Sequence, residues 1–436
     1  MTDRIETLLN RLKHGPVRLC VIGQGYVGLS LAAAAAADGM HVTGIDIDGN
    51  RVGSLSAGTN VVPGVDDGTF ELGVDSGRLN FSTEFSAVAD ADVVVVCVPT
   101  PITEHRPDLS AIEGAGREVG ARLRRGSLVI LESTTYPGTT EQVLQPLLEA
   151  KRLRAGRDFL LAFSPERIDP GNTKYGLRNT PRVVGGIDEA STEAAAAFYR
   201  QLVDDVSPLS SCRAAELAKL LENTFRMVNI ALVNELAMQC NDQGIDTWEV
   251  IRAASTKPFG FMPFYPGPGV GGHCIPLDPT YLAWQSRRDT GRRFRLVELA
   301  QDINAEMPEY VTRRIIDALG KRGVPLSEAN VLALGVTYKP NVGDLRESAA
   351  VECLAQLSRR GVTVSFHDPY VDRITSHGLQ LRRTRLTEKA IASADAVVVL
   401  TPHERYDFDR LVKHARLIFD ARNALAVRGD DRVVTL

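Results

Sequence analysis

Hydrophobic positions along this chain form short continuous apolar runs separated by longer segments of helical periodicity. Residues 17–22 and 91–99 are apolar almost throughout, and residues 129–134 begin another such run. A strand that reads as a continuous apolar run, rather than an alternating one, is covered on both faces of its sheet. An alanine-rich helical pattern follows the first run, and a second strand then ends at Asp46. This order predicts serial βα units around an open parallel sheet.

The same succession of strands recurs near the C-terminus. Residues 330–335, 362–368 and 394–402 resemble the strands at 17–22, 41–46 and 91–99, in the same order. A recurrence of this kind indicates an internal duplication of the fold. The turn after the repeated first strand reads Gly335-Val-Thr-Tyr-Lys339-Pro and has lost the glycine pattern of the first copy. We therefore expect the second copy to bind something other than a dinucleotide through that turn.

A helical segment separates the two copies. Residues 214–242 contain neither proline nor glycine, and apolar side chains recur there at helical spacing. These are Leu217, Leu221, Val228, Leu232 and Leu236. The predicted fold class is α/β, with two Rossmann-like doubly wound domains joined by a long central helix, which is also expected to supply a homodimer face. The expected domains are a first α/β domain at 1–205, a central helical region at 206–315 and a second α/β domain at 316–436.

The turn after the first strand carries the pattern GxGxxG at Gly23, Gly25 and Gly28. The pattern alone is a weak signal, but here it lies between a strand and a helix, and Asp46 ends the next strand, which is the context of a dinucleotide site. The first glycine permits the tight turn, the second lets a pyrophosphate approach the backbone, and the third lets helix and strand pack closely. Asp46 would accept hydrogen bonds from a ribose diol and so favours NAD, although the nearby Arg51 could hold a 2′-phosphate. The helix N-terminus, including Tyr26 and Val27, offers N–H groups to the phosphates.

Composition narrows the class of protein further. The 436 residues include 50 basic and 54 acidic side chains, a formal charge of −4, which argues against a dedicated nucleic-acid binder. No apolar stretch reaches the roughly 20 residues that a membrane-spanning helix needs, and the N-terminus does not read as a signal peptide. The six cysteines are scattered without a CxxC pair, so disulfide frameworks and metal sites are poor interpretations and a cytoplasmic location is expected.

One cysteine differs from the other five in its surroundings. Cys274 lies in the segment FYPGPGVGGHCIPLDP, among glycines and prolines rather than in an apolar periodic run. Glycines remove side chains, so a ligand can approach the backbone and the sulfur. This favours a nucleophilic thiol, with an inert buried thiol as the alternative. His273 is adjacent in sequence, which does not establish contact as a base.

Other polar side chains fall at positions where a site could form. Lys219 and Asn223 are four residues apart on the predicted central helix and so share a face. Together they could stabilise a developing alkoxide, while the alternative for Lys219 is a solvated surface lysine. Thr134 and Glu166 follow predicted strands, and the carboxyl ends of parallel strands face the ligand crevice. The spacing alone does not fix their roles.

With these residues in place, the chain resembles the UDP-glucose/GDP-mannose dehydrogenase family of nucleotide-sugar 6-dehydrogenases. Seven motifs occur in order along nearly the whole chain: VIGQGYVGLS, ADVVVVCVPTP, ESTTYPGTT, FSPERIDPGN, ELAKLLENTFRMVNIALVNELA, GPGVGGHCIPLDP and YKPNVGDLRES. The resemblance implies an NAD-dependent, four-electron oxidation of a sugar C6 alcohol to a carboxylate. It implies that Cys274 forms a thiohemiacetal and then a thioester, which holds the intermediate between two cofactor turnovers.

The resemblance implies that 1–205 is the NAD-binding domain, that 206–315 carries the Cys274 loop and that 316–436 is the nucleotide-sugar-binding domain. It also carries over residue roles. It implies that Lys219 and Asn223 stabilise the oxyanion, that Asp278 and Thr134 position or activate water, and that Glu166 assists proton transfer or hydrolysis. The implied cofactor-binding set is Gly23, Gly25, Tyr26, Val27, Gly28, Asp46, Arg51, Thr100, Ser133, Thr134 and Arg346. The implied substrate-binding set is Glu166, Arg167, Lys219, Asn223, Tyr265, Gly267, Gly269, Gly271 and Lys339. Several family members carry an acid where this chain has Pro170, so that NAD contact is left open.

The sugar itself stays open at this stage. The segment around Cys274 looks most like the branch acting on UDP-N-acetylglucosamine, so a UDP-N-acetylhexosamine, the gluco sugar or its manno epimer, is the first expectation. UDP-glucose or dTDP-glucose is the second. A nucleotide-sugar-binding protein without catalysis is a further alternative, against which the presence of Cys274, Lys219, Asn223 and Asp278 argues.

Overall fold

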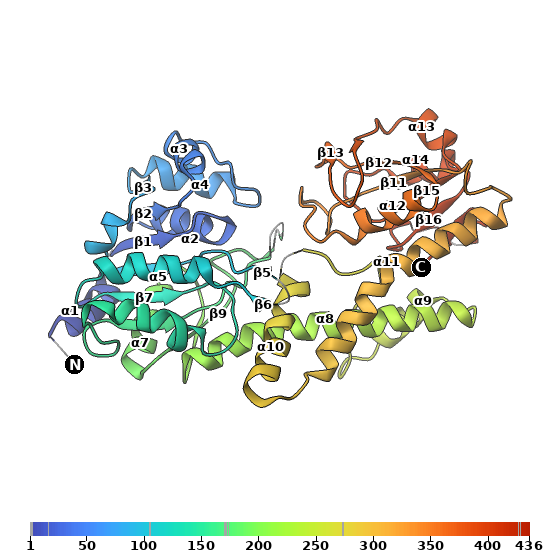
Figure 1. Cartoon of the computed structure of the whole chain (residues 1–436). Helices are drawn as coiled ribbons and strands as arrows, with labels where there is room; N and C mark the ends of the chain where they lie inside the picture. Colours follow the sequence, from blue (N-terminus) through green and yellow to red (C-terminus); the bar gives the residue numbers. More distant parts are fainter. Residues whose placement is uncertain are drawn as a thin grey trace. The chain divides into compact units, whose positions relative to one another are not determined.

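The chain divides into two compact units, residues 1–222 and 223–436, each of which is described by itself. The computed structural model describes residues 3–15, 17–103, 106–169, 172, 174–272, 274–425, 427 and 429–436, without the side chains of Asp3, His14 and Cys274. Figure 1 traces the chain from its blue N-terminus to its red C-terminus. Within the described ranges, no helix is both long and apolar enough to cross a membrane.

An eight-stranded sheet forms the centre of the first unit (Figure 1). Its order is β10-β9-β8-β7-β4-β1-β2-β3, and six of these strands, β3-β2-β1-β4-β7-β8, follow the order of a dinucleotide-binding fold. All neighbouring strands are parallel except β8 and β9, which are antiparallel. The strands are β1 (Arg18–Ile22), β2 (His41–Ile45), β3 (Leu79–Ser82), β4 (Val93–Val96), β7 (Leu128–Leu131), β8 (Leu160–Phe163), β9 (Arg182–Gly186) and β10 (Val206–Leu209).

Apolar cores cover both faces of this sheet, as the continuous apolar runs predicted. Alternate residues of β4 enter opposite cores: Val93 and Val95 pack in one, Val94 and Val96 in the other. This is the period of two that a strand imposes on its side chains. The helices and short elements of the unit are α1 (Asp3–His14), α2 (Tyr26–Ala37), α3 (Gly49–Ser56), α4 (Asp67–Asp75), η1 (Phe85–Ala89), β5 (Ile102–Thr103), β6 (Arg106–Pro107), α5 (Ser110–Arg122), η2 (Thr140–Leu144), α6 (Gln145–Leu148), η3 (Glu149–Lys151) and α7 (Glu189–Tyr199).

The second unit contains a five-stranded parallel sheet of order β12-β11-β15-β16-β17. Its β12-β11-β15 core repeats β2-β1-β4 of the first unit, so the predicted duplication is confirmed. The elements of this α/β part are β11 (Asn330–Leu334), α12 (Ala349–Arg359), β12 (Thr363–His367), β13 (Arg373–Ile374), β14 (Leu381–Arg382), α13 (Glu388–Ser393), β15 (Ala396–Val399), α14 (Phe408–His414), β16 (Ile418–Asp420) and β17 (Val433–Thr435).

Long helices connect the two α/β parts in the sequence. The predicted central helix is α8 (Cys212–Asp242), 31 residues long, and it includes the boundary between the units. It is followed by α9 (Thr247–Ser255), α10 (Cys274–Thr290) and α11 (Arg295–Lys321). Two parallel-sheet domains and a central helical region confirm the predicted fold class.

Candidate active site

The glycine turn after β1 has the geometry that each glycine was expected to provide. Gly23 has a φ of +92°, which a side chain would strain, so it permits the turn. A Cβ on Gly28 would lie 1.9 Å from the carbonyl oxygen of Gly23, so this glycine allows the helix to pack against the turn. A Cβ on Gly25 would meet no atom within 4 Å. The space at Gly25 is therefore left open by the protein, as a pyrophosphate requires.

The helix that follows this turn suits an anionic group. α2 begins at Tyr26 and Val27, and no side chain caps its N-terminus at Gly25. The backbone N–H groups of a helix N-terminus and the helix dipole attract phosphate. The open space at Gly25 and the uncapped helix start therefore fit the pyrophosphate of a dinucleotide.

Asp46 holds the glycine turn in place. It is buried, its Oδ2 accepts hydrogen bonds from the backbone N–H of Gln24 and from Arg51 Nη1, each at 2.8 Å, and its Oδ1 accepts from Asp48 N–H. Arg51 thus pairs with Asp46. The ribose contact of Asp46 remains a prediction, and any ribose hydroxyl would have to share this carboxylate with Arg51.

The duplicated turn after β11 uses the same arrangement with one addition. Asp368 accepts hydrogen bonds from Val336 N–H and Tyr370 N–H, each at 2.8 Å, as Asp46 does from its own turn. Here His403 takes the place of Arg51 as the side-chain partner of the acid, with its Nε2 2.9 Å from Asp368 Oδ2. Burial would raise the pKa of Asp368, but the hydrogen bonds from His403 and the backbone outweigh it and hold that pKa below its usual value.

His403 has its tautomer assigned by its neighbours. Its Nδ1 accepts a hydrogen bond from the backbone N–H of Asn341 at 2.9 Å, so in the neutral ring Nε2 carries the proton and donates to Asp368. His403 and Asp368 are both completely buried. This internal pair fixes the turn that carries Lys339, whose ammonium lies 5.7 Å from the ring centroid of Tyr338. The acid of the second copy is thus used within the protein, and the turn that it holds lacks the glycine pattern of the first copy.

The glycine-rich segment before Cys274 packs directly on this second turn. Gly272 N–H donates to the carbonyl oxygen of Arg346 at 3.0 Å. A Cβ on Gly272 would lie 2.8 Å from the Tyr338 ring, and one on Gly271 would lie 2.5 Å from the Glu347 carbonyl oxygen. These glycines therefore serve close packing of protein on protein, a reason that the sequence interpretation, which assigned them to ligand approach, did not include.

The earlier part of the same segment is anchored to α8. Gly267 N–H donates to Asn234 Oδ1 at 3.0 Å, and a Cβ there would lie 2.2 Å from the Arg422 guanidinium. Gly269 has a φ of +142°. Tyr265 is exposed and stacks on Trp248 with ring centroids 6.0 Å apart. The helix α10 begins at Cys274, while the Cys274 side chain, His273 and Pro170 lie outside the described residues.

Two predicted catalytic side chains meet in the second unit. Asn223 Nδ2 donates to Asp278 Oδ2 at 2.5 Å, and both side chains are buried. Lys219 lies one turn earlier on α8 and is half-buried. Among the described residues, its ammonium has no hydrogen-bond or ion-pair partner. A half-buried cation without a partner favours the functional interpretation over that of a solvated lysine.

The strand ends of the first unit bring together another predicted group. Thr100 Oγ1 donates to the carbonyl oxygen of Thr134 at 2.8 Å, and Ser133 Oγ donates to that of Val98 at 2.7 Å, which ties the ends of β4 and β7 together. Arg167 pairs with Glu222 at 2.8 Å. Arg346 lies in the other unit, exposed and paired with Asp344 at 2.6 Å, and its predicted contact with the cofactor remains a prediction.

Several polar residues with structural importance were missed by the sequence interpretation. Buried Glu216 of α8 accepts hydrogen bonds from Gly138 N–H and Thr140, so it caps the segment after ESTTYPG, and burial raises its pKa. Arg182, Asn234 and His403 were also missed. Each is a charged or polar side chain that borders or interrupts an apolar run, and this position could have marked it in the sequence. The periodicity of the sequence does not indicate its hydrogen-bond partner.

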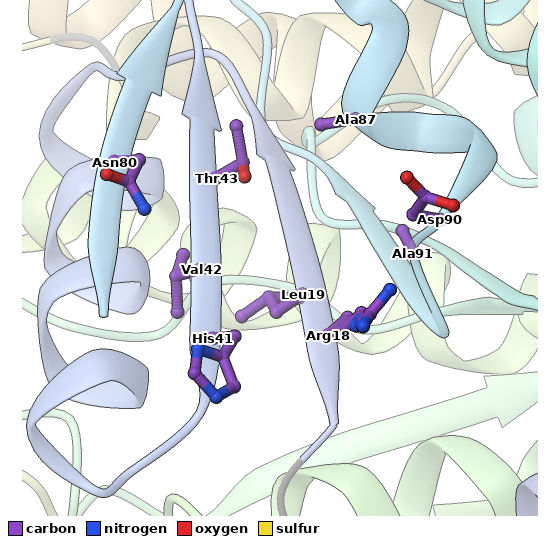
Figure 2. Close-up of a pocket in the computed structure, with 9 residues that line it drawn as sticks. All are labelled: Arg18, Leu19, His41, Val42, Thr43, Asn80, Ala87, Asp90 and Ala91. Carbon is purple, nitrogen blue, oxygen red and sulfur yellow. The ribbon is translucent and has the colours of Figure 1, made fainter. Parts of the chain in front are cut away.

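A pocket of about 170 Å³ lies away from all of these residues. Figure 2 shows it at one end of β1 and β2, with Arg18, His41 and Asp90 among its lining. Arg18 and His41 are the first residues of their strands, so this is the amino end of the sheet, whereas ligands of such folds bind at the carboxyl ends. The pocket contains none of the predicted site residues.

The glycine turn gives a prediction with an internal control. Gly28→Ala should lower the free energy of unfolding by about 1–3 kcal/mol, because its Cβ has no room against Gly23. Gly25→Ala should leave thermal unfolding unchanged, yet weaken NAD⁺ binding at least ~10-fold by filling the open space. Thermal unfolding and calorimetric titration with NAD⁺ measure the two effects. Equal NAD⁺ affinity in Gly25→Ala and the parent would contradict the assignment of this turn to the pyrophosphate.

The first sheet, its glycine turn and the acid after β2 define a dinucleotide-binding protein. Profiles of the UDP-glucose/GDP-mannose dehydrogenase family match the NAD-binding domain at residues 17–203, the central domain at 213–306 and the UDP-binding domain at 332–427. The chain therefore belongs to the UDP-glucose/GDP-mannose dehydrogenase family. Its predicted class, an NAD-dependent nucleotide-sugar dehydrogenase, is confirmed, as are NAD as cofactor and a nucleotide sugar as substrate.

Individual relatives support the same assignment. The UDP-N-acetyl-D-mannosamine dehydrogenase of Pyrococcus horikoshii is 35% identical over 416 residues, which cover 94% of this chain and 96% of the relative. The UDP-N-acetyl-D-glucosamine 6-dehydrogenase of Pseudomonas aeruginosa is 34% identical over 421 residues, which cover 94% and 97%. The solved structure of a UDP-D-ManNAc dehydrogenase from Pyrococcus horikoshii matches with a TM-score of 0.86 at 33% identity, covering 96% of this chain and 98% of that one.

Proposed function

We propose that this dehydrogenase oxidises the C6 hydroxymethyl group of a UDP-N-acetylhexosamine, the gluco sugar or its manno epimer, to the uronic acid through a thioester on Cys274. The observation that carries the proposal is the packing of the Cys274 segment on the Tyr338–Lys339 turn of the UDP-binding domain. A nucleotide held at that turn would bring its sugar to the segment that carries the thiol. The relatives named for UDP-N-acetylmannosamine and UDP-N-acetylglucosamine support this sugar class.

The Gly25 turn and the start of α2 would hold NAD⁺, which would supply the oxidising power of the reaction as a hydride acceptor in each of two rounds. After the first round the C6 alcohol has lost a hydride and a proton and is an aldehyde. Cys274 Sγ adds to the aldehyde carbon, forming a C–S bond and a hydroxyl or oxyanion. After the second round the same carbon is a thioester. Water then adds, the C–S bond breaks, and the thiol and a carboxylate are released. The net consumption is one water and two NAD⁺ for each uronate.

Side chains of this protein are assigned to stabilise the oxyanion and to activate the hydrolytic water. The Lys219 ammonium is the group we assign to the oxyanion on C6, because a preorganised cation stabilises charge as it develops. Asn223 donates to Asp278, so the amide orients this carboxylate. In our proposal Asp278 and Thr134 activate the hydrolytic water and Glu166 assists the proton transfer. In the same proposal, Lys339 contacts the nucleotide. The proposed domains are residues 1–205, 206–315 and 316–436.

One assay tests the reaction and the sugar together. The protein is mixed with NAD⁺ and, separately, UDP-N-acetylglucosamine, UDP-N-acetylmannosamine, UDP-glucose, dTDP-glucose or GDP-mannose, and NADH is followed by absorbance. We expect two NADH per sugar with an N-acetylhexosamine. A higher kcat/KM with UDP-glucose or dTDP-glucose would overturn the sugar assignment, and no NADH with any sugar would favour a binding protein without catalysis. Preference for NADP⁺ would overturn the role of Asp46.

We also propose a homodimer through α8. Leu221, Phe225 and Leu232 are 63%, 45% and 61% exposed, and their spacing places them along one stripe of the helix. Large apolar side chains gathered in this way mark an association surface. The double variant Leu221→Asp with Leu232→Asp should sediment as a monomer while the parent sediments as a dimer. A monomeric parent in sedimentation equilibrium would contradict this assembly.

A further inference from the structure

A buried ionic cluster lies at the carboxyl edge of the first sheet. Arg182 is 3% exposed, Glu132 is 1% exposed, and Tyr199 is completely buried. A buried ion pair is costly to desolvate and contributes little stability by itself. Its presence in this part of the fold therefore calls for a reason other than stability.

The antiparallel strand β9 brings Arg182 to this edge. Phe163 of β8 pairs with Gly185 of β9, and β8 runs in the opposite direction. Arg182, three residues before Gly185, therefore lies beyond the carboxyl end of β8, beside Ser164 and Glu166. In this fold, ligands bind outside the carboxyl ends of the strands.

The guanidinium of Arg182 is shared between two carboxylates. It forms an ion pair with Glu132, which follows β7, and its Nη1 lies 3.4 Å from Glu166 Oε2. Its Nε donates to Ser164 Oγ at 3.0 Å, and its Cζ lies 4.3 Å from the ring centroid of Tyr199 on α7. The planar fork of arginine can make these contacts simultaneously, whereas the single ammonium of lysine cannot.

Both carboxylates accept further hydrogen bonds besides those from Arg182. Glu166 Oε1 accepts hydrogen bonds from the N–H groups of Arg167 and Ile168, at 2.7 and 2.5 Å. Glu132 accepts from the Tyr199 hydroxyl and, at 3.3 Å, from the Cys97 thiol. Glu166 is thus fixed by the backbone on one side and by Arg182 on the other, while Glu132 and Tyr199 fix Arg182.

We propose that Arg182 is a positioning residue of this dehydrogenase, which orients the Glu166 carboxylate for its step. Glu132 and Tyr199 support Arg182 and do not touch the substrate. The inference rests on the proposed role of Glu166. It adds that Arg182, supported by Glu132 and Tyr199, holds the Glu166 carboxylate in position.

The charge balance of the cluster gives the inference a pH signature. Burial raises the pKa of Glu132, Arg182 lowers it, and Glu166 raises it. Cys97 and Tyr199 also face the cluster, and the pKa of each is raised, first of all by burial. Removing Arg182 leaves two carboxylates next to each other without their cation, so one of them takes up a proton at higher pH.

The first test is Arg182→Met, compared with the parent enzyme in kcat, KM and pH dependence. We expect kcat to fall ~10²-fold with KM for NAD⁺ unchanged, because misplacement of a reacting group costs about that factor. The acidic limb of the kcat profile should move up by about 1 pH unit. Arg178→Met is the matched control, because it removes an exposed ion pair to Asp38 from the same unit. It should leave kcat and the pH profile unchanged.

Additional variants keep the inference testable if Arg182→Met does not fold. Glu132→Gln with Arg182→Met removes both charges of the buried pair, which proteins tolerate better than the loss of one. It should fold and still show the fall in kcat. Glu166→Gln, alone and combined with Arg182→Met, completes a double-mutant cycle, and the two effects should be less than additive.

The outcomes separate the inference from the proposed function. One outcome would overturn the inference alone. In it, Glu166→Gln is impaired, while a folded Arg182→Met or Glu132→Gln/Arg182→Met keeps the parent kcat and pH profile. Parent kcat in Glu166→Gln would overturn the proposed role of Glu166 and the inference with it. Strictly additive effects in the cycle would show that Arg182 does not act through Glu166.

Discussion

Cys274→Ser should lower the steady-state rate of uronate formation by at least ~10³-fold, the largest effect expected from any single substitution in this chain. The hydroxyl of serine is a far weaker nucleophile than a thiolate at neutral pH, so the aldehyde carbon is no longer captured covalently. The first oxidation does not require the sulfur, and one NADH per sugar can still form slowly. The measurement is NADH and uronate formed per enzyme over time, in single-turnover and multiple-turnover conditions.

The control for this variant is a cysteine without a proposed role in the reaction. Cys240 is 4% exposed on α8, and Cys240→Ala should keep the parent rate. Uronate formed by Cys274→Ser at the parent rate would show that the reaction does not pass through a thioester. A loss of activity in both variants would instead indicate a general sensitivity to cysteine replacement.

The parts of the fold that are determined by residues close in sequence could be predicted from the sequence. Continuous apolar runs predicted strands that are covered on both faces of the sheet. The absence of proline and glycine predicted α8 to within two residues of its observed start. The glycine turn was predictable because each glycine has a separate steric task, and the distances at Gly25 and Gly28 match those tasks. Local rules of this kind depend on residues that are close in sequence.

Contacts between distant residues were beyond the same rules. Arg182 reaches back 50 positions to Glu132 because β9 runs antiparallel to β8, a pairing that no local pattern indicates. His403 pairs with Asp368 across 35 positions. Gly271 and Gly272 pack closely on Tyr338, a contact that local patterns do not indicate because Tyr338 lies far along the chain, and the substrate contact of Gly271 stays a prediction. Tertiary packing thus gives these residues structural tasks that depend on partners distant in the sequence.

Lys219→Ala should reduce kcat by ~10²–10³-fold, the second largest expected effect, with little change in the KM for NAD⁺. Removing one preorganised group that stabilises an oxyanion costs about this factor, because the charge develops only as the C6 oxygen loses its proton or the thiol adds. Thermal stability should be unchanged within ~0.5 kcal/mol, since the Lys219 ammonium has no partner among the described residues. Steady-state kinetics with the best sugar substrate, alongside thermal unfolding, provide the measurement.

Two variants on α8 serve as comparisons for Lys219→Ala. Lys219→Arg keeps the charge but changes its shape and reach, so it should recover only part of kcat. Arg213→Ala removes an exposed cation that pairs with Glu141 at 2.7 Å, and it should retain the parent kcat. If Lys219→Ala kept the parent kcat while Cys274→Ser lost it, the oxyanion would have to be stabilised by another group, for which Asn223 is the nearest candidate on the same face of the helix. An Asn223→Ala variant would then be expected to carry the loss assigned here to Lys219.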